Sequence, residues 1–109
     1  MVNTRQLGAR YENLAKKELE KQGWTVYRVP GSTQWSKSVD IFHLFDLFCV
    51  RYGKYRLIQI KLNKKPPMGP YDEFWEENKC NDLDIECWAF WGKGKRKSKQ
   101  GWEKIKWSL

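Results

Sequence analysis

Gln59 and Lys61 stand two residues apart in the stretch LIQIKLNKK, which spans residues 57–65. In a β-strand these two side chains share one face, because successive side chains point to opposite sides of the sheet. One interpretation is that this face meets water. The other is that the amide and the ammonium group belong to a catalytic site.

Asp46 is an acidic residue within the apolar run FDLFCV, residues 45–50. Its side chain must find partners or a metal ion, because an unpaired buried charge is costly. The residues between this run and the Gln59 strand include Tyr52-Gly53-Lys54, which is typical of a hairpin turn. If the two strands pair in antiparallel fashion across that turn, Asp46 and Gln59 are neighbours.

A third oxygen donor can come from the N-terminal segment, where apolar spacing predicts a helix from Asn3 or Thr4 to about Gln22. Glu12 borders the apolar stripe of this helix, and an i,i+4 ion pair with Lys16 is the alternative role for it. Two carboxylates and an amide oxygen form the kind of ligand set that Mg²⁺ prefers. Lys61 would then stabilise charge on a phosphate or hold the attacking water.

The elements that must position these residues follow from turn residues and apolar runs. Gly23 is expected to stop the first helix, and Asp72 to cap a short helix that ends at Lys79. Strands are predicted over 24–29, 45–50, 55–62, 85–91 and 102–107, with a Pro/Gly loop over 64–70 and a basic loop over 92–101. The order is αβββαββ. A single domain over 1–109, of the α/β or α+β class with a mixed sheet covered by helices, packs these elements economically.

Composition favours a folded chain that binds polyanions. The 109 residues include seven Trp and carry a formal net charge of +8, which favours nucleic acid as a partner over a membrane surface. No apolar run approaches the length of a membrane span, and the N-terminus lacks a secretory apolar region. The three cysteines are odd in number and lack CxxC spacing. We therefore expect a cytoplasmic protein without a disulfide framework.

Asp46, Gln59 and Lys61 form the pattern D-x12-Q-x-K, preceded by the helical Glu12. This pattern resembles the PD-(D/E)XK nuclease fold, and in particular the archaeal Holliday-junction resolvases. The opening TRQLGARYENLA is also similar to the start T-R-x-x-G-x-x-x-E of a second small nuclease-fold family. The resemblance covers most of the chain: the first helix (GARYENLAKKELEKQGW), an Arg and Ser segment (RVPGS), the metal-binding hairpin (DLFCVRYGKYRLIQIKLNKK) and the last two strands (ECWAFW and GWEKIKW).

The resemblance implies a restriction-endonuclease-like mixed central sheet flanked by helices. It further implies a Mg²⁺-dependent endonuclease, with Mn²⁺ as an alternative cation, that acts as a homodimer on branched DNA. Its metal ligands would be Glu12, Asp46, Gln59 and the backbone carbonyl of Ile60, and Lys61 would stabilise the transition state.

DNA contacts are expected along the same path. The resemblance implies that Arg28 and Ser32 contact the scissile phosphate; a surface arginine and a turn-capping serine are the alternative. Basic residues that follow the hairpin or lie in the basic loop are expected to contact the DNA backbone, where they add affinity without reading sequence. A solvated hairpin tip is the alternative for the loop. These residues are Lys64, Lys65, Lys93, Lys95, Arg96, Lys97 and Lys99.

The sequence departs from the family pattern in three ways. Gln59 stands where the family usually has Glu, although Mrr-type members of the fold carry a Q-x-K version. No proline precedes Asp46. Asp40, in the sequence S-V-D, is a rival for the metal aspartate, and we prefer Asp46 because its distance from Gln59 fits one short hairpin.

Three functions are therefore open at the level of the sequence. The first is a metal-dependent endonuclease of the Holliday-junction-resolving type. The second is a nuclease for other branched, nicked or single-stranded DNA. The third is a catalytically inactive or weak nuclease-fold protein that binds nucleic acid, which the glutamine at position 59 makes plausible.

Overall fold

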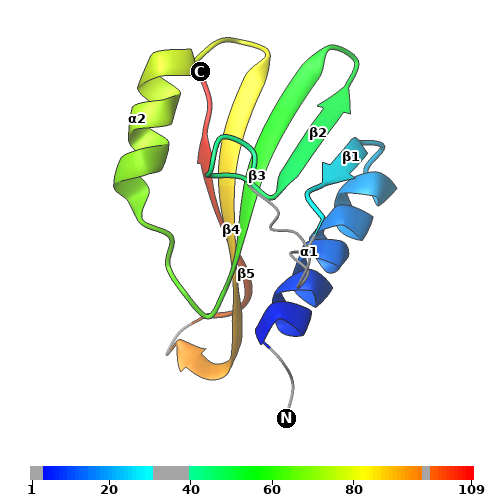
Figure 1. The fold of residues 1–109 in the computed structure, drawn as a ribbon, viewed down its shortest axis with the longest axis vertical. Helices are drawn as coiled ribbons and strands as arrows, with labels where there is room; N and C mark the ends of the chain where they lie inside the picture. The colour runs from blue at the N-terminus through cyan, green and yellow to red at the C-terminus, as the bar shows by residue number, and fades with distance from the viewer. Residues whose placement is uncertain (1–3, 31–39, 97–98) are drawn as a thin grey trace.

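The computed structural model describes residues 4–30, 40–96 and 99–109, and within them it has two helices and five strands (Figure 1). Their order along the chain is αβββαββ, as predicted. One mixed five-stranded sheet confirms a mixed α+β protein. The elements are α1 (Thr4–Lys21), β1 (Thr25–Arg28), β2 (Leu47–Arg51), β3 (Lys54–Leu62), α2 (Met68–Asn78), β4 (Leu83–Arg96) and β5 (Lys99–Trp107).

Helix α1 ends as Gly23 predicts. Gly23 has a φ of 93°, in the left-handed region, and its N–H donates to the carbonyl of Glu20 at 3.0 Å. The N–H of Trp24 donates to the carbonyl of Leu19 at 3.1 Å. Together these bonds form a Schellman motif, which satisfies carbonyls at the end of the helix. The motif turns the chain into β1, with Trp24 packed against the core beneath α1.

The strands lie in the sheet in chain order, β1-β2-β3-β4-β5. Every neighbouring pair is antiparallel except β3 and β4, which are parallel. Strands β2 and β3 are joined by the predicted turn, in which Tyr52 and Gly53 both have positive φ, 50° and 78°. Two central residues with positive φ are the geometry that suits a tight hairpin. The parallel pair needs a crossover connection, and α2 supplies it.

Each face of the sheet is covered by one helix, and Figure 1 shows the sheet between α1 and α2. Ile58 and Ile60 of β3 point into the core beneath α1. Leu57 points into the other core, where it packs with Tyr71 and Trp75 of α2. The alternation of β3 therefore serves two buried cores, not one core and one wet face. The thiols of Cys49 and Cys87 are buried in these cores and Cys80 is exposed; all three are free, in agreement with the expectation of no disulfide framework.

The predicted start of α2 is wrong. The helix begins at Met68, four residues before Asp72, so that Gly69 and Pro70 lie in its first turn. Proline is tolerated there because the first N–H groups of a helix have no acceptor within it. Asp72 instead accepts a hydrogen bond of 2.7 Å from the indole of Trp107, which ties α2 to β5.

The predicted basic loop over 92–101 is also corrected. Strand β4 continues to Arg96 and β5 begins at Lys99, so these two residues pair across the hairpin. The register shifts between Trp91 and Arg96, where the ladder is irregular. Strand pairing satisfies backbone groups whatever the side chains are, which is why a polar, glycine-containing run was misread as a loop.

Candidate active site

Asp46 lies at the point where β2 begins, between its two neighbouring strands. Its N–H donates to the carbonyl of Ile58 at 2.9 Å, and its carbonyl accepts from the N–H of Val29 at 3.0 Å. Its side-chain Oδ2 accepts a hydrogen bond of 2.8 Å from the N–H of Ile60. Main-chain contacts to both neighbouring strands therefore fix this carboxyl group in place.

Gln59 lies beside Asp46, as the hairpin predicts. The register pairs Leu47 with Ile58, so one step further along the two strands Asp46 stands opposite Gln59. Gln59 is only 6% exposed, and its Nε2 donates to the carbonyl of Ile60 at 3.3 Å. The interpretation that this residue meets water is therefore wrong.

Lys61 is partly exposed and follows Gln59 on the same face of β3. Burial raises the pKa of the Cys87 thiol to about 12, and the positive charge of Lys61 acts in the opposite direction. Asp46 also influences the same thiol. The charges of Lys61 and Asp46 thus both act on this thiol, in opposite directions.

Glu12 reaches this end of the sheet from α1 and is paired with Arg28, the last residue of β1. Arg28 Nε donates to Glu12 Oε1 at 3.1 Å, and about a fifth of each side chain is exposed. Burial raises the pKa of Glu12, while the charge and hydrogen bond of Arg28 oppose the rise. The predicted alternative, an ion pair between Glu12 and Lys16, is wrong, because Lys16 pairs with Glu20.

Asp40, the rival metal aspartate, lies beside Asp46. Burial raises the pKa of Asp46 to about 7, against which the hydrogen bond from Ile60 acts. The negative charges of Glu12 and Asp40, and a side-chain hydrogen bond with Asp40, raise it further. Three carboxyl groups therefore influence one another at this end of the sheet.

The donors fit a hard divalent cation in their chemistry. Asp46 is 7% exposed, and its side-chain partners in the described part of the chain are an amide N–H and another carboxyl group, not a cation. The predicted ligands, Glu12, Asp46, Gln59 and the Ile60 carbonyl, are all oxygen donors, which Mg²⁺ prefers. A buried carboxyl group without a cationic partner is the feature that a metal ion would complete.

The arrangement of these donors is not that of a closed metal site. Glu12 is held by Arg28, and the amide nitrogen of Gln59 points at the Ile60 carbonyl. Among residues 4–30, 40–96 and 99–109, no group of three or more His, Cys, Asp and Glu residues has metal-binding spacing. Coordination of a cation by all four predicted ligands would require the amide of Gln59 to turn, and use of Glu12 Oε1 would require Arg28 to leave it.

Most, but not all, of the residues predicted to contact DNA lie in the part of the chain that the structure describes. Lys64 and Lys65 are exposed and follow the end of β3, on the chain segment that leaves the site. Lys93, Lys95 and Arg96 lie on β4 and Lys99 on β5, rather than in a loop. Ser32 and Lys97 lie outside the described residues.

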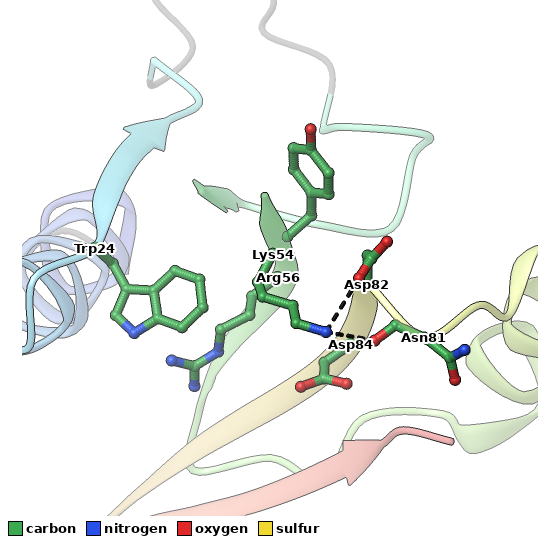
Figure 2. Close-up of a pocket in the computed structure, with 7 residues that line it drawn as sticks. Trp24, Lys54, Arg56, Asn81, Asp82 and Asp84 are labelled. Atoms are coloured by element: carbon green, nitrogen blue, oxygen red, sulfur yellow. Dashed lines mark hydrogen bonds and ion pairs between the residues drawn. The ribbon is translucent and has the colours of Figure 1, made fainter. Parts of the chain in front are cut away.

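A pocket of about 270 Å³ opens at the other end of β3 and is separate from the candidate site. Figure 2 shows the indole of Trp24 facing Arg56, with Lys54 reaching toward Asp82 and Asn81. Lys54 pairs with Asp82 at 3.0 Å. Arg56 forms hydrogen bonds of 2.6 and 2.8 Å with the buried Glu86, and Asp84 pairs with Lys106. Its charged side chains neutralise one another, so the pocket has the character of a structural ion-pair network.

Sequence reasoning missed two contacts of the candidate site. The pairing of Arg28 with Glu12 joins residues 16 positions apart, and no local pattern signals it. The contact of Asp40 with Asp46 was hidden because the two were treated as alternatives. The S-V-D motif was the available signal, since it placed a second acid close to the start of β2.

No protein-family model and no curated protein matches this sequence. Within the described residues, no helix is long and apolar enough to cross a membrane.

Proposed function

We propose that this protein is a Mg²⁺-dependent DNA endonuclease of the restriction-endonuclease-like fold, acting as a homodimer on four-way junctions. The observation that supports it best is the buried carboxyl group of Asp46, opposite Gln59 and close enough to Glu12 and Asp40 for their charges to raise its pKa. A mixed sheet between two helices, with these residues at one end of its first three strands, agrees with the expectation from the sequence.

The reaction is hydrolysis of a phosphodiester. Water adds to phosphorus and one P–O ester bond breaks, so the products are a phosphate monoester and a hydroxyl group. The leaving oxygen takes up one proton of the water, and the other proton passes to solvent. When bound, Mg²⁺ supplies charge stabilisation and lowers the pKa of the attacking water.

The residues of the chain have separate tasks in this proposal. Glu12, Asp46, Gln59 and the carbonyl of Ile60 hold the cation. Lys61 follows Gln59 on the same face of β3, and it stabilises the negative charge that builds on the phosphate. Asp46 is held by two strands and can keep its position without help from substrate.

The test is cleavage of a synthetic four-way junction beside a linear duplex of the same sequence, with Mg²⁺ and with EDTA. Cleavage of the junction that EDTA abolishes is expected. Asp46→Ala should reduce it by at least about a hundredfold, since loss of groups around a metal already costs 10- to 100-fold. DNA binding should be retained, because the basic residues are unchanged.

Asp40→Ala is the matched control, because it removes a neighbouring carboxyl group of the same type. If Asp40→Ala abolishes cleavage and Asp46→Ala does not, the assignment of the metal aspartate is wrong. If the protein cuts nicked, flapped or single-stranded DNA in preference to the junction, it is a nuclease, but its substrate differs from the one proposed.

A catalytically inactive DNA-binding protein is the second candidate function. Two observations favour it: Glu12 is held by Arg28, and position 59 carries an amide where a charged ligand is expected. This candidate predicts DNA binding without cleavage in Mg²⁺ or Mn²⁺, and no change in DNA affinity when Asp46 is replaced by Asn.

A further inference from the structure

We propose that Arg28 and a divalent cation compete for the carboxylate of Glu12, so that binding of the cation releases Arg28 toward a substrate phosphate. The inference rests on the proposed function. It assigns to Arg28 a positioning role that couples the metal to the DNA.

The contact between Arg28 and Glu12 joins two elements that are distant in sequence and meet at the candidate site. Arg28 Nε lies 3.1 Å from Glu12 Oε1, between α1 and the end of β1. Arg28 pairs with Leu47 in the sheet, and the next residue, Val29, donates its N–H to the carbonyl of Asp46. The guanidinium is therefore anchored one strand away from the central carboxyl group.

Arg28 supplies the charge that a cation would supply. Only about a fifth of the Glu12 side chain is exposed, and Arg28 is its ion-pair partner at 3.1 Å. A carboxylate among other carboxyl groups needs a counter-ion, and one guanidinium meets that need only in part. A divalent cation bound by Glu12 and Asp46 would repel a guanidinium that remained on the same carboxylate.

Within the part of the chain that the structure describes, Arg28 also has donors left for a second partner. A guanidinium has five N–H groups in a fork that matches phosphate, and the contact with Glu12 uses the one on Nε. The other oxygen of Glu12 lies on the side of Gly8, where an added Cβ would be 3.9 Å away. Both partners thus have groups available for the exchange.

The first test is calorimetric titration of Mn²⁺, and then Mg²⁺, into the parent chain, Arg28→Gln and Arg10→Gln without DNA. Arg10 is exposed on α1, the helix that also carries Glu12. Arg10→Gln therefore changes the net charge by the same amount as Arg28→Gln but leaves the ion pair with Glu12 in place. Arg28→Gln should bind the cation about tenfold more tightly, an effect of the size that groups next to a metal ligand commonly have. Arg10→Gln should match the parent.

The second test is the affinity of each chain for a short DNA duplex with Mg²⁺ and with EDTA, measured by fluorescence anisotropy. The ratio of the two affinities should fall several-fold in Arg28→Gln relative to the parent and to Arg10→Gln. Metal binding and DNA binding are linked in the proposal, so the loss must appear in this ratio.

The outcomes separate the two proposals. If the parent binds the cation and Arg28→Gln binds it equally or more weakly, Arg28 orients Glu12 instead of competing for it, and the exchange is overturned alone. If the parent binds no divalent cation, the proposed function and the exchange both fail. Thermal melts of the three chains confirm that each variant is folded before its affinities are compared.

Discussion

Asp46 is buried beside two other carboxyl groups, and its ionisation therefore opposes folding in the absence of a cation. Its pKa of about 7 lies above the ordinary 3.8, so between these pH values the folded chain binds a proton that the unfolded chain has lost. The stability contributed by this group is complete below about pH 4 and is lost as pH rises through 7. We expect the parent to lose stability relative to Asp46→Asn between about pH 4 and 7, by up to about 4 kcal/mol.

The measurement is urea unfolding of both chains in EDTA at several pH values. The difference between the two chains is the quantity to follow, because titrating groups remote from Asp46 contribute equally to both and cancel. If the parent instead loses stability relative to Asp46→Asn as pH falls, Asp46 is ionised and stabilised in the folded chain.

Gln59 is the residue whose type most affects the proposed chemistry. Gln59→Glu places a fourth carboxyl group at a position only 6% exposed. Without metal the variant should be less stable than the parent at pH 8, because a buried charge joins others of the same sign. With Mg²⁺ it should bind the cation about tenfold more tightly, since a charged oxygen replaces a neutral one.

Calorimetry with Mg²⁺ and thermal melts in EDTA test both statements for residue 59. Unchanged affinity together with lowered stability would place its side chain outside the coordination sphere. The rate of cleavage is not part of this prediction, which concerns metal affinity and stability alone.

The end of α1 depends on one glycine. Gly23 has a φ of 93°, and a Cβ there would lie 3.2 Å from Cζ of Arg51. Gly23→Ala should therefore destabilise the chain by about 1–2 kcal/mol. Gly69→Ala, in the first turn of α2 where an added Cβ meets nothing within 4 Å, should change stability by less or increase it. Denaturant unfolding of the two variants compares them directly, and equal losses would contradict a specific role for the Schellman motif.

The hairpin of β4 and β5 concentrates positive charge near its turn. Five basic residues and no acidic residue lie between positions 93 and 99. Each contact with a phosphate steepens the dependence of log K on log salt concentration by roughly 0.9. Replacing all five residues by Ser or Gln should therefore flatten the slope by up to about four units. They are Lys93, Lys95, Arg96, Lys97 and Lys99.

Fluorescence anisotropy at several salt concentrations, on junction and linear duplex, measures this slope. Affinity for both DNAs should fall together, because phosphate contacts carry no information about branching. An unchanged slope would mean that the basic residues of the hairpin do not contact DNA. A loss of affinity for the junction alone would mean that they recognise the branched structure.

At the scale of the whole molecule, charge is unevenly distributed. Helix α2 has four acidic and no basic residues, so with a net charge of +8 for the chain the remainder carries +12. DNA is therefore expected on surfaces away from α2. The proposed cut of two strands in a junction needs two copies of the site, and exposed aromatic residues such as Tyr27 and Tyr55 offer surface of the kind found at interfaces.

Sedimentation equilibrium tests the homodimer. A mass of twice 13.1 kDa is expected at micromolar concentration. Two chains should bind per junction, and a mixture of parent with excess Asp46→Ala should cut mainly one strand. A monomer that cuts both strands would contradict the proposed assembly.

The sequence by itself determined the local elements and one pairing within the site. Apolar spacing, Gly23 and the turn at Tyr52-Gly53 act over a few residues, so α1 and the β2–β3 hairpin follow from them. The hairpin alone brings Asp46 opposite Gln59. The boundaries of α2 and of the β4–β5 hairpin did not follow, because strand pairing and helix packing extended both elements beyond their local signals.

Only the tertiary structure decided the surroundings of these residues. Burial of Gln59 depends on a helix covering each face of the sheet, and an alternating strand does not reveal whether one face or both are covered. The contacts of Glu12 with Arg28 and of Asp40 with Asp46 arise where α1, the end of β1 and the start of β2 meet. Charged side chains choose partners by distance and burial in space, and neither quantity is contained in their spacing along the chain.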